Sequence, residues 1–435
     1  MQVMKWSLIA AAVAAGSTQL AFASAQSESK GFVEDASANL LLRNTYWNRD
    51  YNKGTADQKV WAQGFIGTFE SGFTQGTVGF GIDAFGLLGV KLDGGAGTAG
   101  DHNLGGIGML NTEGTRNSKG VFPPKDEWSQ AGAAVKARVS NTVLKYGHQM
   151  PELPVLAYDD SRLLPQSFTG TLLTSSEIEG LELNVGRFTQ DSPMWSPASD
   201  EGDLKSINVY GGSYQITDDL SIALYFSDVE DVYKKKYANI NYNIPLGEDR
   251  ALNFDFNIYK TKYDETKYDE DTTANVFFDN DLEGDDNTIW SLAGKYSTGP
   301  HAFILAYQQN SGDVGYAYDM GDGGSAIWVA NSYYSDFNNA DEKSVQASYE
   351  LDFGGYGIPG LSWKTAYVYG YDIKVPNDSD AKEREFFNQV KYTIQSGPAK
   401  DLSFKARNSI YRTDNRFGTD LNEWRLFIEY PLEIL

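Results

Sequence analysis

The sequence has no cysteine and only three histidines among its 435 residues. The absence of cysteine excludes disulfide bonds, thiolate metal sites and cysteine nucleophiles. His102, His148 and His301 are scattered along the chain, with no nucleophile elbow and no metal-binding motif around them. The sequence therefore favours neither an enzyme nor a protein with a metal or other cofactor.

Long apolar runs are also missing, and negative charge is in excess. No stretch of 18 consecutive apolar residues occurs, which excludes helical membrane spans. The 36 basic residues are outnumbered by 59 acidic ones, giving a net charge of −23. This balance argues against nucleic acid as a partner and against simple binding to an anionic surface.

Aromatic residues and glycine, by contrast, are plentiful. Phe, Trp and Tyr make up 14% of the chain, which also holds 44 glycines, and its mean hydropathy is −0.43. Aromatic belts at two membrane interfaces and many tight turns would use both residue types. The composition fits a membrane protein built from strands, whose spanning segments are only half apolar.

The first residues have the pattern of a secretory signal peptide. Lys5 precedes an apolar stretch over 6–15, and small residues around Ala25 offer a cleavage site. The alternative, a buried N-terminal helix, is disfavoured by these flanks and by the polar residues that follow. We expect a signal peptide over 1–25 and a mature chain over 26–435 that forms one domain, since no linker divides it.

Apolar and polar residues alternate with a period of two in segment after segment. In the last one Trp424, Leu426 and Ile428 share one face, while Glu423 and Arg425 share the other. This reading gives eighteen strands, near 38–48, 58–73, 76–88, 127–139, 141–148, 171–176, 181–189, 204–216, 219–227, 231–243, 250–261, 288–297, 301–309, 343–351, 361–371, 384–394, 401–412 and 421–433.

Such alternation also suits the half-buried sheets of a soluble sandwich. Two features favour a membrane barrel instead: the apolar faces end in Trp and Tyr, and short connections alternate with long ones. The short links would lie at the periplasmic end and the long loops outside the cell. The sequence thus predicts an all-β fold, a transmembrane antiparallel barrel of about 18 strands in the outer membrane of a Gram-negative bacterium.

The polar face of the last strands carries a series of cations, which would line the lumen. They are Lys364, Lys391, Lys405, Arg407 and Arg425. Closure of the barrel would add Arg43 and Arg49 from the first strand, and Lys136, Arg138 and Lys145 form a second cluster. A basic wall attracts anions, and guanidinium groups suit carboxylates. Alternatively, each cation pairs with an inner carboxylate such as Glu423, Glu429 or Asp83.

Two of the long loops have unusual compositions. Loop 149–170 is apolar, so we expect it to fold into the lumen and narrow it; the alternative is that it packs above the barrel. Loop 262–287 is strongly acidic but lacks the spacing of a calcium-binding loop. It is predicted to be a solvated outer loop, with bridging through divalent ions to lipopolysaccharide as the alternative.

Four segments carry a resemblance to a known family: SGFTQGTVGFGID at 71–83, DSRLLPQSFTG at 160–170, SGPAKDLS at 396–403 and EYPLEIL at 429–435. Together they resemble the OprD-type family of outer-membrane carboxylate channels. The resemblance spans nearly the whole chain, and the similarity at both ends suggests the OprE-like, monocarboxylate-preferring branch. It implies an 18-stranded barrel, third and seventh loops that fold inward, and a basic ladder that guides carboxylates.

Carried over by position, the resemblance implies a set of solute-binding residues. The basic ladder would be Arg43, Arg49, Arg138, Arg162, Arg187, Lys364, Lys391, Lys405, Arg407 and Arg425, with Asp319 and Asp322 of loop 310–342 as its acidic counterpart. Arg187 shares the phase of Leu183 and Val185, so it would reach the lumen only if the strand bulged near Gly186.

The sequence therefore favours a porin for passive uptake of small carboxylate solutes, without a cofactor, among outer-membrane lipid and lipopolysaccharide. A loose homotrimer and a monomer are both compatible with it. A general-diffusion or sugar channel is the alternative, since Trp47, Tyr225 and Tyr259 fall in the inner phase and could form an aromatic slide. An outer-membrane hydrolase is disfavoured, because no Ser, His and Asp constellation falls on one face.

Overall fold

A computed structural model of the chain describes residues 24–52, 57–93, 108–112, 123–201, 204–264, 284–312, 314–318, 326–375 and 378–435. Most of the expected signal peptide and of the acidic loop lie outside these residues, as do Asp319 and Asp322. In the described part no helix is long and apolar enough to cross a membrane.

Strands make up almost all of the regular structure. Their bounds are β1 Ser37–Tyr51, β2 Gln58–Glu70, β3 Val78–Asp93, β4 Glu127–Val139, β5 Thr142–Gln149, β6 Glu152–Leu153, β7 Leu156–Ala157, β8 Ser167–Ile178, β9 Leu181–Ser192, β10 Ile207–Thr217, β11 Leu220–Val229, β12 Tyr233–Pro245, β13 Arg250–Tyr263, β14 Asp286–Thr298, β15 His301–Gly312, β16 Lys343–Asp352, β17 Leu361–Val375, β18 Asp378–Thr393, β19 Ser403–Thr413 and β20 Leu421–Glu433. A short 3-10 helix, η2 Phe353–Tyr356, follows β16.

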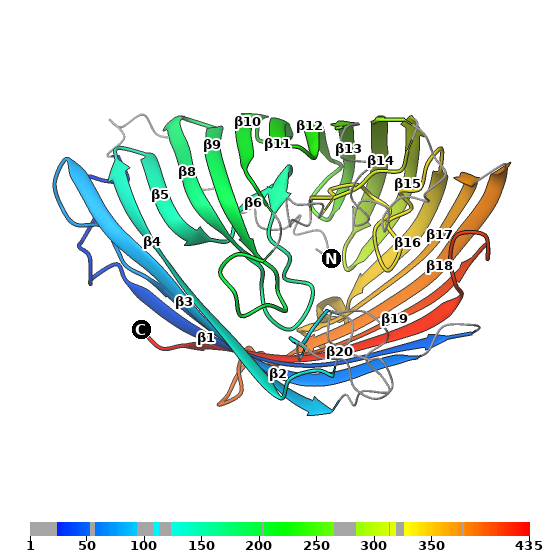
Figure 1. Cartoon of the computed structure of the whole chain (residues 1–435), viewed down its shortest axis with the longest axis horizontal. Helices are drawn as coiled ribbons and strands as arrows, with labels where there is room; N and C mark the ends of the chain where they lie inside the picture. The colour runs from blue at the N-terminus through cyan, green and yellow to red at the C-terminus, as the bar shows by residue number, and fades with distance from the viewer. Residues whose placement is uncertain are drawn as a thin grey trace.

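The strands close into one antiparallel barrel (Figure 1). Each long strand pairs with its neighbours along the chain, and β20 returns to pair with β1, where Arg43 lies opposite Glu429. The sheet has 18 strands, while β6 and β7 form a small hairpin of their own. Closure gives every strand of this sheet a partner on both sides, as a membrane without internal water requires. The prediction of an 18-stranded barrel is confirmed.

The two faces of the wall follow the alternation in the sequence. On β20, Trp424 and Leu426 are 47% and 42% exposed, whereas Arg425 and Phe427, which alternate with them, are each 5% exposed. The apolar phase therefore faces outward and the polar phase faces the lumen. Several boundaries differ from the prediction, among them those of β3, which ends at Asp93, β8, which begins at Ser167, and β18, which begins at Asp378. At these ends the strands continue beyond the apolar band.

The lumen is narrowed by two loops, which Figure 1 shows inside the ring of strands. The third loop, residues 150–166 between β5 and β8, buries Leu163 and Leu164 against Trp47 on the barrel wall. The seventh loop lies between β15 and β16 and is described over 314–318 and 326–342. Its Tyr316 packs in a cluster with Leu156 of the third loop. The predicted inward fold of the third loop is confirmed, and the alternative in which it packs above the barrel is wrong.

Candidate functional site

Side chains on five neighbouring strands form one row across the lumen wall. Trp47 of β1 lies opposite Arg425 of β20, which lies opposite Arg407 of β19. The row continues through Gln389 of β18 to Lys364 of β17. We call these five residues the central row. Because each strand places alternate residues inward, one register line brings together cations that are far apart in the sequence.

A second row lies one step nearer the periplasmic end. Phe427 pairs with Lys405, and Lys405 pairs with Lys391 on the next strand. The Lys405 ammonium lies 4.2 Å from the centre of the Phe427 ring and 3.8 Å from a carboxylate oxygen of Glu429. Lys391 is exposed. The basic wall predicted from the alternation thus lies on the lumen side.

Two of the predicted ladder cations share one buried carboxylate. The Nε atoms of Arg49 and Arg425 both donate to Glu423, Arg49 at 2.6 Å. The Arg425 guanidinium lies 3.9 Å from the centre of the Trp47 ring, and Arg49 lies 5.9 Å from it. Glu423 is 2% exposed. Charge-assisted hydrogen bonds and the ring therefore hold both guanidinium groups in fixed positions and neutralise one of their two charges.

Arg43 holds the third loop against the wall. Its Nη1 and Nη2 donate to the two carboxylate oxygens of Asp160 at 2.7 and 3.0 Å, and its Nε donates to Glu429 at 2.8 Å. Nη1 also donates to the carbonyl oxygen of Arg162 at 3.1 Å. With its donors engaged and 5% of its surface exposed, Arg43 is an anchor for the loop.

Arg407 has a different environment from the other wall arginines. Its Nε is buried without a hydrogen-bond partner, as is Oε1 of the adjacent Gln389. The guanidinium lies 5.0 Å from the centre of the Phe387 ring. Within the described residues no carboxylate forms an ion pair with Arg407. A buried donor without a partner is costly, and this guanidinium, 6% exposed, has no carboxylate beside it to neutralise its charge.

The remaining predicted cations of the inner wall have carboxylate or amide partners. Lys364 pairs with Glu350 at 3.1 Å. Arg138 donates to Oε1 of Gln26 at 2.9 Å. Lys136 and Lys145 both contact Asp83, at 2.5 and 2.6 Å.

The alternative in which the wall cations pair with inner carboxylates therefore holds for most of them. Lys136 and Lys145 pair with Asp83. Arg43 and Lys405 pair with Glu429, and Arg49 and Arg425 pair with Glu423.

Arg162 lies on the third loop above the central row. Its Nη1 is 3.3 Å from Asp159 and 3.5 Å from the sulfur of Met194. Its guanidinium is 5.8 Å from the centre of the Trp47 ring, which therefore has three guanidinium groups around it. The loop thus adds a cation where it narrows the lumen.

Arg187 does not belong to the ladder, and its assignment there is wrong. It is exposed on the outer face with Val185, while Phe188 beside it is buried. The pairing of β8 with β9 does contain a bulge, but the residue left unpaired is Thr189. Because this irregularity lies beyond Arg187, it cannot turn that side chain inward.

Acidic residues of β18 dock the seventh loop, a role that the sequence analysis missed. The carboxylate of Glu385 accepts the backbone N–H groups of Tyr334 and Ser335 at 3.0 and 3.1 Å. Glu383 accepts the Ser335 hydroxyl at 2.8 Å. Both glutamates occur in the inward phase of β18, which was the available signal. Their partners could not be read from the sequence, since no local pattern shows which loop folds over them.

Two carboxyl groups of the seventh loop near this docking site have raised pKa values. Burial raises the pKa of Glu342, and the neighbouring Glu383 carboxylate adds to the rise. Burial likewise raises the pKa of Asp336, which accepts hydrogen bonds from Ser332 and Tyr318. Low dielectric and like charge both disfavour an ionised carboxyl group.

The inner tyrosines proposed for a sugar slide are covered by the loops. Tyr225 is 4% exposed and Tyr259 is fully buried. The Tyr259 hydroxyl donates to the carbonyl oxygen of Pro154 in the third loop at 2.9 Å and accepts the Trp328 N–H of the seventh loop at 3.1 Å. Tyr259 therefore joins the two loops and offers no surface along which a sugar could slide.

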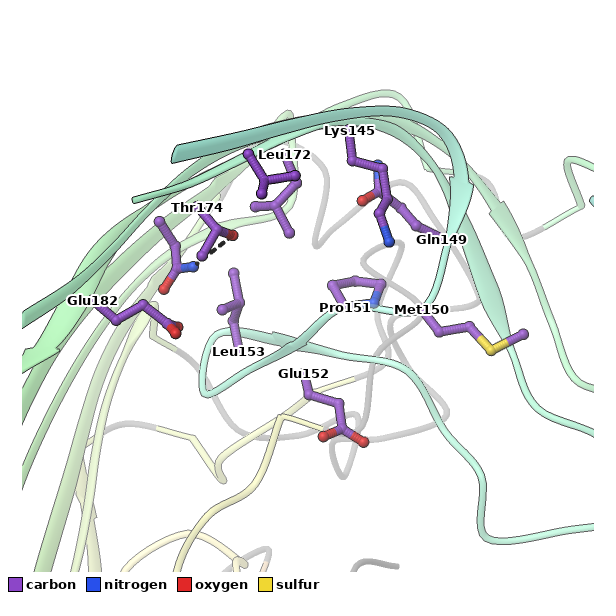
Figure 2. Close-up of a pocket in the computed structure, with 11 residues that line it drawn as sticks. Lys145, Gln149, Met150, Pro151, Glu152, Leu153, Leu172, Thr174 and Glu182 are labelled. Atoms are coloured by element: carbon purple, nitrogen blue, oxygen red, sulfur yellow. Dashed lines mark hydrogen bonds between the residues drawn. The ribbon is translucent and has the colours of Figure 1, made fainter. Parts of the chain in front are cut away.

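A cavity of about 330 Å³ lies between the third loop and the wall formed by β5, β8 and β9. Figure 2 shows the loop segment with Leu153 facing Leu172 and Thr174 of the wall. Lys145 and Glu182 also line it, and the Asn184 amide donates to the Thr174 hydroxyl at 3.1 Å. The cavity gives the space beneath the third loop a mixed polar and apolar lining.

A closed barrel with an apolar outer band, two loops folded into its lumen and a basic inner wall defines a substrate-specific channel of the Gram-negative outer membrane. The sequence matches the family described as outer membrane porin, OprD family, over residues 30–434, and the chain belongs to that family. It is therefore a transport channel and not an enzyme.

Individual relatives agree with this assignment. The chain is 46% identical to Porin D of Pseudomonas aeruginosa, with 100% of both chains covered. Among solved structures, OccAB1 of Acinetobacter baumannii has a TM-score of 0.85 at 41% identity, with 95% of this chain and 100% of that chain covered. OpdK of Pseudomonas aeruginosa, solved with vanillate, has a TM-score of 0.78 at 33% identity, with 93% of this chain and 100% of that chain covered.

Proposed function

We propose that this channel takes up small carboxylate-bearing solutes passively, guided by the cations of its lumen wall. The observation that carries the proposal is Arg407, whose guanidinium faces the lumen with a buried Nε that has no partner. A carboxylate matches this planar group, which can bind it with two parallel hydrogen bonds. The related channel OpdK was solved with vanillate, which is a carboxylate.

The path follows the two rows of the wall. Arg49 and Arg425 keep one net positive charge beside Glu423 at the upper end. Arg407 follows on the central row, and Lys405 and Lys391 lie one step nearer the periplasm. Because these cations follow one another along the wall, an anion can move from one to the next without crossing a large energy barrier.

The wall also supports assignment to the OprE-like, monocarboxylate-preferring branch. On β1, β19 and β20, Arg407 has no ion pair among the described residues, whereas Arg43, Arg49 and Arg425 each contact a carboxylate. One guanidinium without an ion pair can bind one carboxylate with two parallel hydrogen bonds. A solute with a single carboxylate would therefore form its full set of hydrogen bonds at Arg407. A second carboxylate on the same solute would add less binding free energy.

Flux into liposomes tests the substrate class. Benzoate and benzamide have nearly the same size and shape but differ in charge, so their flux ratio isolates the carboxylate. We expect benzoate to enter several times faster than benzamide through the purified channel. Equal rates, or faster entry of a neutral sugar of similar size, would support a general-diffusion or sugar channel instead.

We also propose that the mature chain begins at Gln26. Its buried side chain donates to the carbonyl oxygens of Thr74 and Gly76 at 2.9 and 3.1 Å and accepts from Arg138. These contacts give the first mature residue a fixed place at the periplasmic rim. Mass spectrometry of the N-terminal peptide from purified outer membranes should identify residue 26 as the first, and a peptide that begins before Ala25 would contradict the proposal.

A further inference from the structure

The outer face of the barrel carries a group of cations at the extracellular ends of β9, β12 and β13. It consists of Arg187, Lys234, Lys236, Lys260 and Lys262, which we call the outer basic patch. Lys236 lies opposite Lys260, and Lys234 lies opposite Lys262. All five are exposed. In a chain of net charge −23, such a concentration of positive charge on the outer wall requires an explanation.

The patch lies at the upper edge of the apolar band. Below it on the outer face of β12 come Ile240 and Tyr242, which are 50% and 45% exposed. Register places Lys236 level with Tyr210 and Phe226, whose rings stack with their centres 5.2 Å apart. Aromatic rings of this kind mark the level of the lipid headgroups. The ammonium groups are therefore where the headgroups of the outer leaflet begin.

The charges of the patch are only partly compensated. Lys234 lies 3.3 Å from Asp228, and Lys262 lies 2.9 Å from Asp285. Among the described residues Lys236 and Lys260 have no ion-pair partner, although they face each other across two paired strands. Like charges directly opposite each other destabilise a strand pair. An anion held between the two ammonium groups would remove that repulsion.

We propose that the outer basic patch binds the phosphate groups of a phosphorylated glycolipid of the outer leaflet, with Lys236 and Lys260 as the central contacts. Acyl chains would lie along the apolar band below, and the phosphates would meet the ammonium groups at its edge. A soluble anion would interact only with the ammonium groups. A glycolipid would interact with them through its phosphates and with the apolar band through its acyl chains, so the position of the patch at the edge of the band suits a glycolipid. The inference does not depend on the solute that passes through the lumen.

Binding of purified lipid A to the detergent-solubilised channel, measured by native mass spectrometry, tests the proposal. The variant K236Q/K260Q keeps polar side chains of similar length but removes both central charges. We expect it to bind diphosphoryl lipid A about tenfold or more weakly than the unaltered channel. Dephosphorylated lipid A should bind the unaltered channel weakly, and inorganic phosphate alone should not compete at millimolar concentration.

The matched control is K59Q/K343Q, which loses the same charge from the same end of the outer face. Lys59 and Lys343 contact Asp93 and Asp372 at 3.8 and 3.0 Å, so each already has a carboxylate partner. The lipid A affinity of K59Q/K343Q should stay within about twofold of that of the unaltered channel. Both variants should keep the heat-dependent gel shift of a folded barrel and the same benzoate flux, which separates this proposal from the proposed transport function.

Four results would overturn the proposal. They are unchanged lipid A binding by K236Q/K260Q, an equal loss in K59Q/K343Q, equal binding of the dephosphorylated lipid, and loss of binding when EDTA removes divalent ions. The last result would mean that carboxylates hold the phosphates through bridging metal ions. The equal loss in the control would mean that net charge alone, and not this patch, attracts the lipid.

Discussion

Glu423 determines how much positive charge the upper lumen wall presents. It is buried and accepts hydrogen bonds from both Arg49 and Arg425. One carboxylate beside two guanidinium groups leaves a single net charge, and it also fixes the position of both groups over Trp47. The selectivity of this region therefore depends on a residue that does not itself attract anions.

Replacing Glu423 with Gln should increase the preference for anions. The amide keeps the shape of the side chain but releases a second full positive charge toward the lumen, so the zero-current potential in a salt gradient should shift toward that of chloride. Breaking a buried ion pair by removing one partner also destabilises a protein, here by about 3 kcal/mol or more. Reversal-potential measurements in planar bilayers give the first effect, and the unfolding midpoint in urea gives the second.

Asp228→Asn is the matched control for this prediction, since it removes a carboxylate that contacts Lys234 on the outer face. Its reversal potential should equal that of the unaltered channel. A shift of equal size in both variants would show that overall charge controls selectivity. No shift in the Glu423 variant would show that Arg49 and Arg425 do not contribute to the anion path.

The two inward loops act as one element because they share an anchor. Tyr259 on the barrel wall hydrogen-bonds to the third loop through Pro154 and to the seventh through Trp328. The third loop is also held by Arg43 through Asp160, and the seventh by Glu385. The width of the lumen is thus fixed by wall residues that lie behind the loops.

Tyr259→Phe should weaken the attachment of the third and seventh loops to the wall, while the aromatic ring keeps its packing contacts. Loss of the hydroxyl leaves the Pro154 carbonyl and the Trp328 N–H unsatisfied, at a cost of about 1–3 kcal/mol for a buried group. We expect more frequent conductance fluctuations and a higher mean conductance in single-channel recordings. Tyr225→Phe is the control, because its hydroxyl donates to Asn184 on the wall and not to a loop. Quiet, unchanged recordings from the Tyr259 variant would contradict the shared-anchor explanation.

The seventh loop should dock less firmly as the pH rises. The pKa of Glu342 is raised in the docked loop by burial and by Glu383, so the docked state binds the proton more tightly than the released state. Stability linked to this proton is complete below the ordinary carboxyl pKa and declines as the pH rises toward the raised value. Conductance fluctuations should therefore increase as the pH rises above the ordinary carboxyl pKa toward the raised pKa of Glu342. Glu342→Gln should remove this trend, and a trend that persists in it would assign the titration to another group.

Period-two alternation predicted the barrel well because one rule applies to every spanning strand. Each outward residue meets lipid and each inward residue meets the lumen, so residues such as Trp424 and Arg425 reveal the face of the wall directly. The phase does not reveal partners. Arg43 was correctly placed on the inner wall, but its role as an anchor depends on Asp160, which is 117 residues away. The inward position predicted for Arg187 depended on a local bulge, and the sequence does not show where a bulge occurs.

At the scale of the whole molecule, charge is separated by location. The chain has a net charge of −23, and much of its acidic excess occurs in loop 262–287. Cations instead follow the lumen wall of β1 and β17 to β20 and the outer basic patch on β9, β12 and β13. A barrel keeps these surfaces apart because successive side chains of each strand point to opposite faces of the wall. The proposed carboxylate path inside and the proposed lipid site outside therefore lie on separate surfaces.

The central claim is that a guanidinium without an ion pair on the lumen wall, that of Arg407, selects carboxylates. The flux ratio of benzoate to benzamide in an Arg407→Gln variant tests it most directly. The ratio should fall several-fold, since an interaction of about 1.4 kcal/mol changes occupancy tenfold. The loss should shrink in about 1 M salt, where the screening length is about 3 Å. Arg187→Gln, which loses the same charge from the outer face, should keep the ratio of the unaltered channel. A parallel fall of both fluxes, or an unchanged ratio in the Arg407 variant, would contradict the claim.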